Sequence, residues 1–324
     1  MKNKAVRNIV GLLFVFIIFG ANLIAQDRNE VIKFYNEGAA LMKTDVPAAI
    51  KAFENVISLS DKVGESAADL KQKAAQVLPG LYLKVASTAL SEKKPAPEVL
   101  RASKTAVAAA EKYGTAAHKE NAGKMLVLAY NNMATGLFTG KEYDKALLTF
   151  DSLLAINPGF LNAIYNKALI YRGQNNIPAF EETIDLFLGK LESGKDDAKA
   201  KQASSMALEF LRAAGSQANQ ANKLDEALEL LNKASKYGDD KDVFYYFADV
   251  YNKQKNFDKG AEYAQKGLDL ETGDAEAKAK FYYQLGNAQA GKGQTADACA
   301  SFKNALYGPF AEAAKALRTN LKCN

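Results

Sequence analysis

The stretch of this 324-residue chain that most suggests chemistry is a glycine-rich run near its C-terminal end. Gly286–Gly293 reads GNAQAGKG, which is close to a phosphate-binding loop, and Gly291–Ala296 reads GKGQTA, a loose dinucleotide-binding pattern. The first run lacks the Ser or Thr that would hold magnesium, and neither run follows a predicted strand. Both therefore read better as parts of a turn between two helices.

Other residue types that carry catalysis or hold metal ions are sparse. His118 is the only histidine and has no cysteine cluster beside it, so a typical zinc site is excluded, and its charged neighbours indicate a solvated helix face. Carboxylate pairs such as Glu181-Glu182 and Asp196-Asp197 are common at helix starts, where the dipole favours them, and we interpret them as solvated charge. No nucleophile elbow and no HExxH motif occurs. We expect a protein that is not an enzyme, with no catalytic residue, no metal site and no cofactor.

The first 25 residues have the order of a secretory signal peptide. Three basic side chains are followed by the apolar run Ile9–Phe19 and by a short tail that ends at Ala25. We expect removal of residues 1–25 and export to the periplasm or cell envelope. Because Leu23 stands where cleavage favours a small residue, an uncleaved segment that anchors the chain is the alternative, although the run is short for a spanning helix.

The composition is that of an ordinary folded protein, with 48% hydrophobic and 24% charged residues. Without residues 1–25 the chain keeps 39 basic and 37 acidic side chains, so the net charge falls from +5 to +2. A nearly neutral chain without a basic stripe binds nucleic acid poorly, because phosphate contacts dominate that affinity. We expect no nucleic-acid partner and no membrane insertion beyond the signal segment.

The elements that position these residues are helical hairpins that recur along the chain. Within residues 280–307, Tyr282, Leu285 and Gly286 mark one helix, and Ala298 and Phe302 mark a second, with a glycine-bearing turn between them. The small residues stand where the two helices would touch, and the large ones on the faces that bury apolar area. Similar runs begin near residues 127, 208 and 241, at a period of about 34 residues.

This pattern resembles the tetratricopeptide repeat, a helix-turn-helix unit. The resemblance implies an all-α fold: a right-handed α-α superhelix (solenoid) of about seven repeats with a C-terminal capping helix, with residues 26–324 as a single solenoid domain. An irregular helical bundle is the alternative. Pro79-Gly80 is expected to kink or break the first helix of the second hairpin. The expected hairpins are 29–59, 67–112, 115–156, 161–191, 196–236, 242–270 and 276–307, with the cap at 311–321.

The resemblance also implies a binding face. In this family the first helices of successive hairpins line a concave groove that holds an extended peptide or a partner helix. Amides can hydrogen-bond a peptide backbone in both directions, and tyrosines offer apolar contact with a polar tip. The alternative is that the residues on this face are solvated helix side chains that bind no partner. Carried over position by position, the expected partner-binding residues are Asn131, Asn132, Thr135, Tyr165, Asn166, Arg212, Ser216, Asn219, Tyr245, Tyr246, Asp249, Asn252, Tyr283, Gln284 and Asn287.

The expected function is a non-catalytic scaffold of the bacterial envelope that binds a protein or peptide in this groove. The lysine-rich clamp of family members that bind a C-terminal carboxylate is not reproduced, because Asp249 and Gln284 stand on this face. One alternative is a glycan- or cell-wall-associated factor that uses the tyrosines as a sugar platform. Another is a structural subunit of a membrane-bound assembly that docks through its convex side. The sequence does not identify the partner.

The two cysteines, Cys299 and Cys323, lie close together near the C-terminal end. An exported chain meets an oxidising compartment, so a disulfide between them is one reading. It would close a loop of about 25 residues and hold the capping helix. Two unrelated thiols, one half-buried and one at a frayed end, are the other reading.

Overall fold

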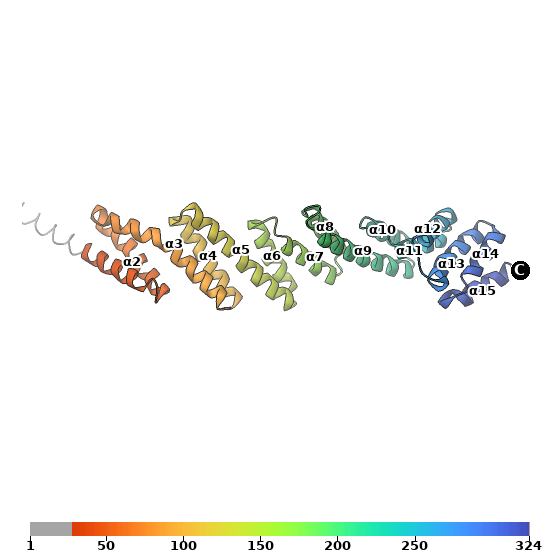
Figure 1. Cartoon of the computed structure of the whole chain (residues 1–324), viewed down its shortest axis with the longest axis horizontal. Coiled ribbons are helices and arrows are strands. Elements are labelled where there is room, and N and C mark those ends of the chain that lie inside the picture. Colours follow the sequence, from red (N-terminus) through yellow and green to blue (C-terminus); the bar gives the residue numbers. More distant parts are fainter. Residues whose placement is uncertain (1–27, 324) are drawn as a thin grey trace, which may run out of the picture. The chain divides into compact units, whose positions relative to one another are not determined.

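The computed structural model describes residues 28–323, so the predicted signal peptide, 1–25, lies outside the described residues. The chain divides into two compact units, residues 28–166 and residues 167–323 of the described part, and Figure 1 labels the helices of each. Throughout residues 28–323 the regular elements are helices, and no strand occurs. The all-α class expected from the sequence is confirmed. A single domain over 26–324 remains a prediction.

The first unit is a series of helices in which each contacts the next. A helix over residues 28–41 precedes α2, the short 3-10 turn η1 follows α2, and α3, α4, α5 and α6 then contact one another in chain order. Helices α3 and α5 also contact each other, as the first helices of neighbouring hairpins should. The bounds are α2 Val46–Val63, η1 Gly64–Ala67, α3 Ala68–Ser91, α4 Ala96–Tyr113, α5 Ala116–Thr139 and α6 Tyr143–Ile156.

The second unit continues the same plan and contains the expected cap. Helix α7 crosses the boundary between the units, and from α9 onward each hairpin contacts the next. The first helices α9, α11 and α13 also contact one another in series, so one face is built from three successive hairpins. The bounds are α7 Leu161–Gly173, α8 Ile177–Gly189, α9 Asp197–Gln220, α10 Leu224–Ser235, α11 Lys241–Lys253, α12 Phe257–Leu270, α13 Ala275–Gly291, α14 Thr295–Asn304, η2 Gly308–Phe310 and α15 Ala311–Asn320.

The two helices of a hairpin meet where the sequence places a small residue opposite a large one. A Cβ added at Gly286 in α13 would lie 2.7 Å from the ring of Phe302 in α14, which is fully buried. Gly215 in α9 approaches Leu231 in α10 in the same way, with 2.9 Å to the Leu231 side chain. These close approaches are what the tetratricopeptide pattern predicts. The expected tetratricopeptide-like hairpins are confirmed.

Pro79 does not break α3, which runs without interruption from Ala68 to Ser91. Of the two expected outcomes, the break was wrong, and the kink stays a prediction. Proline removes one N–H from the helix ladder, but its neighbours Leu78 and Leu81 are 1% and 5% exposed and hold this stretch against the core. Apolar burial on both sides of the proline therefore outweighs the lost hydrogen bond.

Candidate functional site

Three first helices, α9, α11 and α13, carry most of the partner-binding residues expected from the sequence. Their side chains form three groups: a row of ion pairs, a buried network of amides and a carboxylate, and a group of aromatic rings. We refer to these together as the α9–α11–α13 face.

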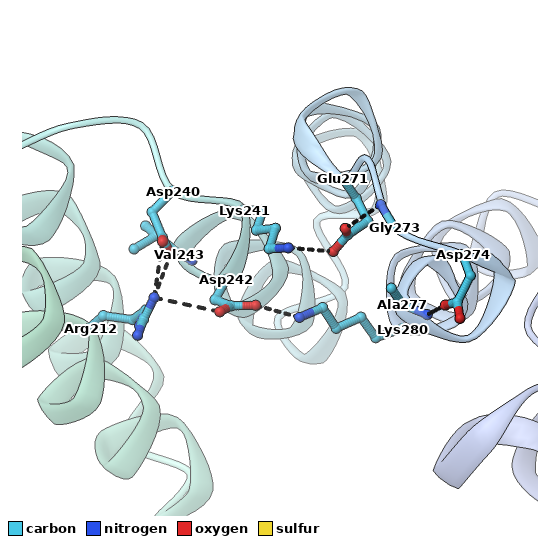
Figure 2. Close-up of polar contacts among 10 residues, drawn as sticks. All are labelled: Arg212, Asp240, Lys241, Asp242, Val243, Glu271, Gly273, Asp274, Ala277 and Lys280. Carbon is cyan, nitrogen blue, oxygen red and sulfur yellow. Dashed lines mark hydrogen bonds and ion pairs between the residues drawn. The ribbon is translucent and has the colours of Figure 1, made fainter.

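The row of ion pairs crosses from α9 to α13 (Figure 2). Arg212 Nη1 lies 3.0 Å from both carboxylate oxygens of Asp240 and 3.5 Å from Oδ2 of Asp242. Asp242 in turn pairs with Lys280 of α13. Asp240 also caps α11, because its Oδ1 accepts from the N–H of Val243 at 2.9 Å. Since the charged side chains are 22–33% exposed, they can exchange partners with an incoming charged ligand.

A second ion pair beside this row ties α11 to the α12–α13 turn (Figure 2). Lys241 Nζ lies 2.8 Å from Oε2 of Glu271, and the N–H of Gly273 donates to Oε1 of the same carboxylate at 2.9 Å. The hydrogen bond from Lys241 and the one from Gly273 lower the pKa of Glu271. Glu271 is 6% exposed, so these two donors replace its lost contacts with water.

Replacement of Glu271 by glutamine is expected to destabilise the protein at neutral pH and to matter little in acid. Because the folded-state pKa of Glu271 is lowered, its contribution is fully present above the ordinary carboxyl pKa of about 4.3. That contribution is lost as the pH falls through the lower folded-state value. Urea midpoints of wild type and Glu271→Gln should therefore differ at neutral pH and converge in acid.

The matched control for this prediction is Glu262→Gln on α12. Glu262 pairs with Lys266 across one helical turn, and both side chains are about half exposed. Exposed pairs of this kind contribute little to stability. A pH-independent gap for Glu271→Gln, or an equal effect in Glu262→Gln, would contradict the role of the buried carboxylate.

The amide group links all three helices through Asp249 of α11. Asn219 Nδ2 donates to one carboxylate oxygen of Asp249 at 2.6 Å, and Gln284 Nε2 donates to the other at 2.9 Å. Asn252 Nδ2 donates to the backbone and side-chain oxygens of Gln284, and Lys253 Nζ donates to Asn219 Oδ1. Asn219 and Gln284 are 3% and 2% exposed. These side chains hold the hairpins together.

This burial corrects the expectation that the amides of the face are free to bind a peptide backbone. Asn219 and Gln284 have no open surface for it, and Ser216 is 7% exposed, with its hydroxyl in contact with Gln220. The sequence pattern identifies the right helical face but not the depth at which the next hairpin covers it. Asp249 and Asn252 are half-buried and belong to the same network.

The aromatic group lies beside the ion pairs. The ring of Tyr245 is 6.2 Å from Phe281 and 6.3 Å from Phe310, measured between centroids, and Tyr283 is 5.4 Å from Phe310. Tyr246 packs edge-on against Tyr245 at 5.2 Å. Burial raises the pKa of Tyr245 to about 12, and the charge of Asp249 adds to this, so its hydroxyl stays protonated at neutral pH.

The remaining expected residues are not all part of this face. Asn287 is half-buried on α13. On α5, Asn132 and Thr135 are exposed and Asn131 is half-buried, and Tyr165 and Asn166 are half-buried on α7. The α5 and α7 residues belong to the unit of residues 28–166, which is described separately from the α9–α11–α13 face.

Several side chains of the α9–α11–α13 face and its surroundings were missed by sequence reasoning. Lys280 and Asp242 pair across 38 positions, and Phe310 follows a Gly-Pro pair in a segment that reads as a connection. Asp240 carried a local signal, because Asp is a preferred N-cap residue. The pairings of Lys280 and the placement of Phe310 have no local signal of this kind.

The other residues considered for chemistry have structural roles. Gly286–Gly293 lies in α13 and the turn to α14, as expected. His118 is not merely solvated: its Nδ1 accepts from the N–H of Thr115 at 3.3 Å in a capping box at the start of α5. The expectation that Glu181 is solvated was wrong, since its side chain is 14% exposed and pairs with Lys233 of α10 and with Lys236, the residue that follows this helix.

Among residues 28–323, no group of three or more His, Cys, Asp or Glu side chains is arranged to hold a metal ion. Within that range, none of the helices combines the length and apolar character needed to cross a membrane.

The two cysteines form a disulfide in the structure. Cys299 in α14 is bonded to Cys323, which follows α15, with their Cα atoms 5.6 Å apart. Arg318 of α15 donates from Nη1 to the backbone oxygen of Cys299 at 2.5 Å. The end of the capping helix is therefore tied to the last hairpin by a covalent bond and a hydrogen bond.

The first unit has a separate cleft of about 430 Å³ between α2, α3 and α4. Its floor is apolar, and its rim carries Glu54, Asp61 and Lys112 beside two tyrosines. Tyr82 donates its hydroxyl to Glu54 Oε1 at 2.5 Å, and Asp61 pairs with Lys71, so the acidic groups already have partners. The cleft is therefore the weaker candidate site.

Comparison with known proteins finds similarity at the level of solved structures. No family model and no curated protein matches the chain. YrrB, described as a TPR protein with an unusual peptide-binding site, is 16% identical over 60% of this chain and 92% of its own, with a TM-score of 0.35. MamA is 20% identical over 57% and 96%, with a TM-score of 0.33. A tetratricopeptide repeat protein from Parabacteroides merdae is 19% identical over 92% and 100%, with a TM-score of 0.29.

Proposed function

We propose that this chain, built from tetratricopeptide-like hairpins, is an exported, non-catalytic scaffold that binds a protein or peptide of the bacterial envelope. The partner binds at the α9–α11–α13 face. The observation that carries the proposal is the group of half-buried tyrosines, Tyr245 and Tyr283, beside exchangeable ion pairs. Residues 1–25, with their signal-like order, support export.

The chemistry of this face is better suited to binding a peptide than to catalysing a reaction. Tyrosines held by their neighbours lose little conformational entropy on binding and offer a large apolar surface, which makes them frequent interface anchors. The carboxylates and cations around them are paired with each other. A partner with a central apolar side chain and charged flanks would match both groups.

The glycan alternative is less well supported by the arrangement of the rings. Tyr245 meets Tyr246 and Phe281 edge-on, with interplanar angles of 63° and 89°, and Tyr283 meets Phe302 at 60°. These rings are packed against one another and do not form an open, flat platform for a sugar. We therefore favour a protein or peptide partner.

Replacement of Tyr245 or Tyr283 by alanine is expected to weaken partner binding by about 1–3 kcal/mol each, the range of an aromatic hot spot. The tagged full-length chain is recovered from the envelope, and its intact mass is checked for an N-terminus at Gln26. Cross-linked proteins are then identified by quantitative mass spectrometry, and the most enriched one is purified to measure its affinity for each variant.

The matched control is Tyr307→Ala. Tyr307 is 46% exposed and lies outside the aromatic group, so its loss should leave both binding and helicity unchanged. If Tyr245→Ala and Tyr283→Ala keep wild-type affinity for the purified partner, the binding face has been assigned to the wrong side of the hairpins.

A further inference from the structure

The aromatic group of the proposed binding face is partly covered by the chain's own C-terminal segment. Phe310, the last residue of the 3-10 turn η2, contacts both Tyr283 of α13 and Tyr245 of α11 through its ring. Among the described residues, Phe310 thus joins the two tyrosines through ring contacts. Phe310 therefore occupies the place where an apolar side chain of a partner would be expected.

The turn that presents Phe310 lies closely on α13. Gly308 has a φ of +53°, which favours glycine, and Pro309 restricts the next step of the backbone. A Cβ at Gly308 would lie 2.7 Å from Oε1 of Glu276, in the first turn of α13. The segment thus fits the face as a bound peptide would, with an aromatic anchor held by a tight turn.

The helix that follows this turn is held by few buried side chains. Of the ten residues in α15, Ala314 is the one that is fully buried. Leu317 and Leu321 pack only partly against the last hairpin. The disulfide between Cys299 and Cys323 lies at the far end of the helix, thirteen positions after Phe310. Phe310 can therefore leave the tyrosines while the end of the segment stays attached.

We infer that η2 is a built-in occupant of the aromatic site, and that the site takes an aromatic side chain from a turn-forming peptide of the partner in place of Phe310. This inference rests on the proposed function and specifies the partner's chemistry. Phe310 follows the end of α14 by six residues of backbone, and the disulfide holds the other end of the segment. A displaced Phe310 therefore remains at high effective concentration and competes reversibly with the partner.

The test uses the full mature chain and a synthetic peptide with the sequence of residues 305–317, ALYGPFAEAAKAL. Phe310→Ala empties the site while the disulfide and α15 remain. We expect this variant to bind the peptide at least about tenfold more tightly than wild type, in which the tethered Phe310 competes at an effective concentration of roughly millimolar. Binding is followed by NMR titration, which detects affinities in this range.

Three controls identify the site that is used. The peptide in which the phenylalanine is replaced by alanine should not bind to Phe310→Ala. The double variant Phe310→Ala/Tyr283→Ala should lose the gain, because one wall of the site is missing. Lys315→Ala, an exposed position on α15, should behave as wild type. Circular dichroism checks that every variant keeps its helical content.

The inference is overturned if Phe310→Ala gains no affinity over wild type, or if the peptide binds equally well without its phenylalanine. Such a result leaves the proposed function standing when the purified partner still depends on Tyr245 and Tyr283. If the partner is indifferent to both tyrosines, the proposed function itself fails. The two failures are therefore distinguishable.

Discussion

Replacing Phe281 with alanine is expected to lower the free energy of unfolding by about 3–5 kcal/mol, the usual cost of deleting a buried aromatic ring. Phe281 lies in α13, is 0% exposed and packs directly on Gly267 of α12. Its removal would leave a cavity between two successive hairpins, and the surrounding backbones can close such a cavity only in part. Urea unfolding of a chain of residues 26–324, followed by circular dichroism, measures the loss.

A double-mutant cycle tests whether this loss arises at the contact with Gly267. A Cβ at Gly267 would lie 2.3 Å from the ring of Phe281, so Gly267→Ala should cost about 1–3 kcal/mol by overpacking. In the Phe281→Ala background the same change should cost less, because the cavity admits the added methyl group. Strictly additive effects would show that the two residues are not in contact.

The matched control is Gly136→Ala, in the last turn of α5. A Cβ there meets no atom within 4 Å, so alanine should stabilise the helix by about 0.5–1 kcal/mol. A glycine-to-alanine change is thus expected to raise the free energy of unfolding at Gly136 and to lower it at Gly267. Destabilisation at both positions would point to a general effect of the substitution.

Removal of the disulfide is expected to have the second large effect, concentrated in the C-terminal cap. Cys299 and Cys323 are 24 positions apart, and a closed loop of that size is worth about 3 kcal/mol in the chain-entropy model. Since Ala314 is the one fully buried residue of α15, little else holds that helix in place. The variant Cys299→Ser/Cys323→Ser should therefore open α15 locally while the hairpins before it stay folded.

Hydrogen exchange resolved by mass spectrometry measures this effect. Amides of residues 311–320 should exchange much faster in the double-serine variant, and those of α11 and α12 should exchange as in wild type. Reduction of the wild-type protein should reproduce the result without any substitution. Unchanged protection of α15 in both experiments would mean that its packing, and not the bond, holds the cap.

The positions of the helices follow largely from local patterns in the sequence. The expected hairpins 115–156 and 242–270 agree closely with α5–α6 and α11–α12, because apolar periodicity, turns and caps act over a few residues. The last expected hairpin, 276–307, is too long, since α14 ends at Asn304 before the chain turns into η2. Local patterns also mispredict the helix around Pro79. Burial of its neighbours keeps the helix continuous through a residue that tends to break helices.

The sequence predicted which helices carry the candidate site, but not how their side chains contact one another. The pattern placed Asn219, Asp249 and Gln284 on the first helices of their hairpins, and the structure finds them there. It did not indicate that they hydrogen-bond to one another across 30 and 35 positions, and so the expected free amides became a buried network. Burial depends on the rotation of each hairpin against the next, and helical periodicity alone does not specify that rotation.

Residue types and their spacing are enough to establish a chain of tetratricopeptide-like hairpins with a helix after the last one, because each hairpin is stabilised by contacts between near neighbours in sequence. Tertiary structure alone decides that Lys280 reaches Asp242, that Phe310 covers Tyr245 and Tyr283, and that Cys323 meets Cys299. These contacts depend on how successive hairpins stack and where the cap docks. The stability of each of these contacts comes from many weak packing interactions contributed by several helices. A short stretch of sequence does not determine their total.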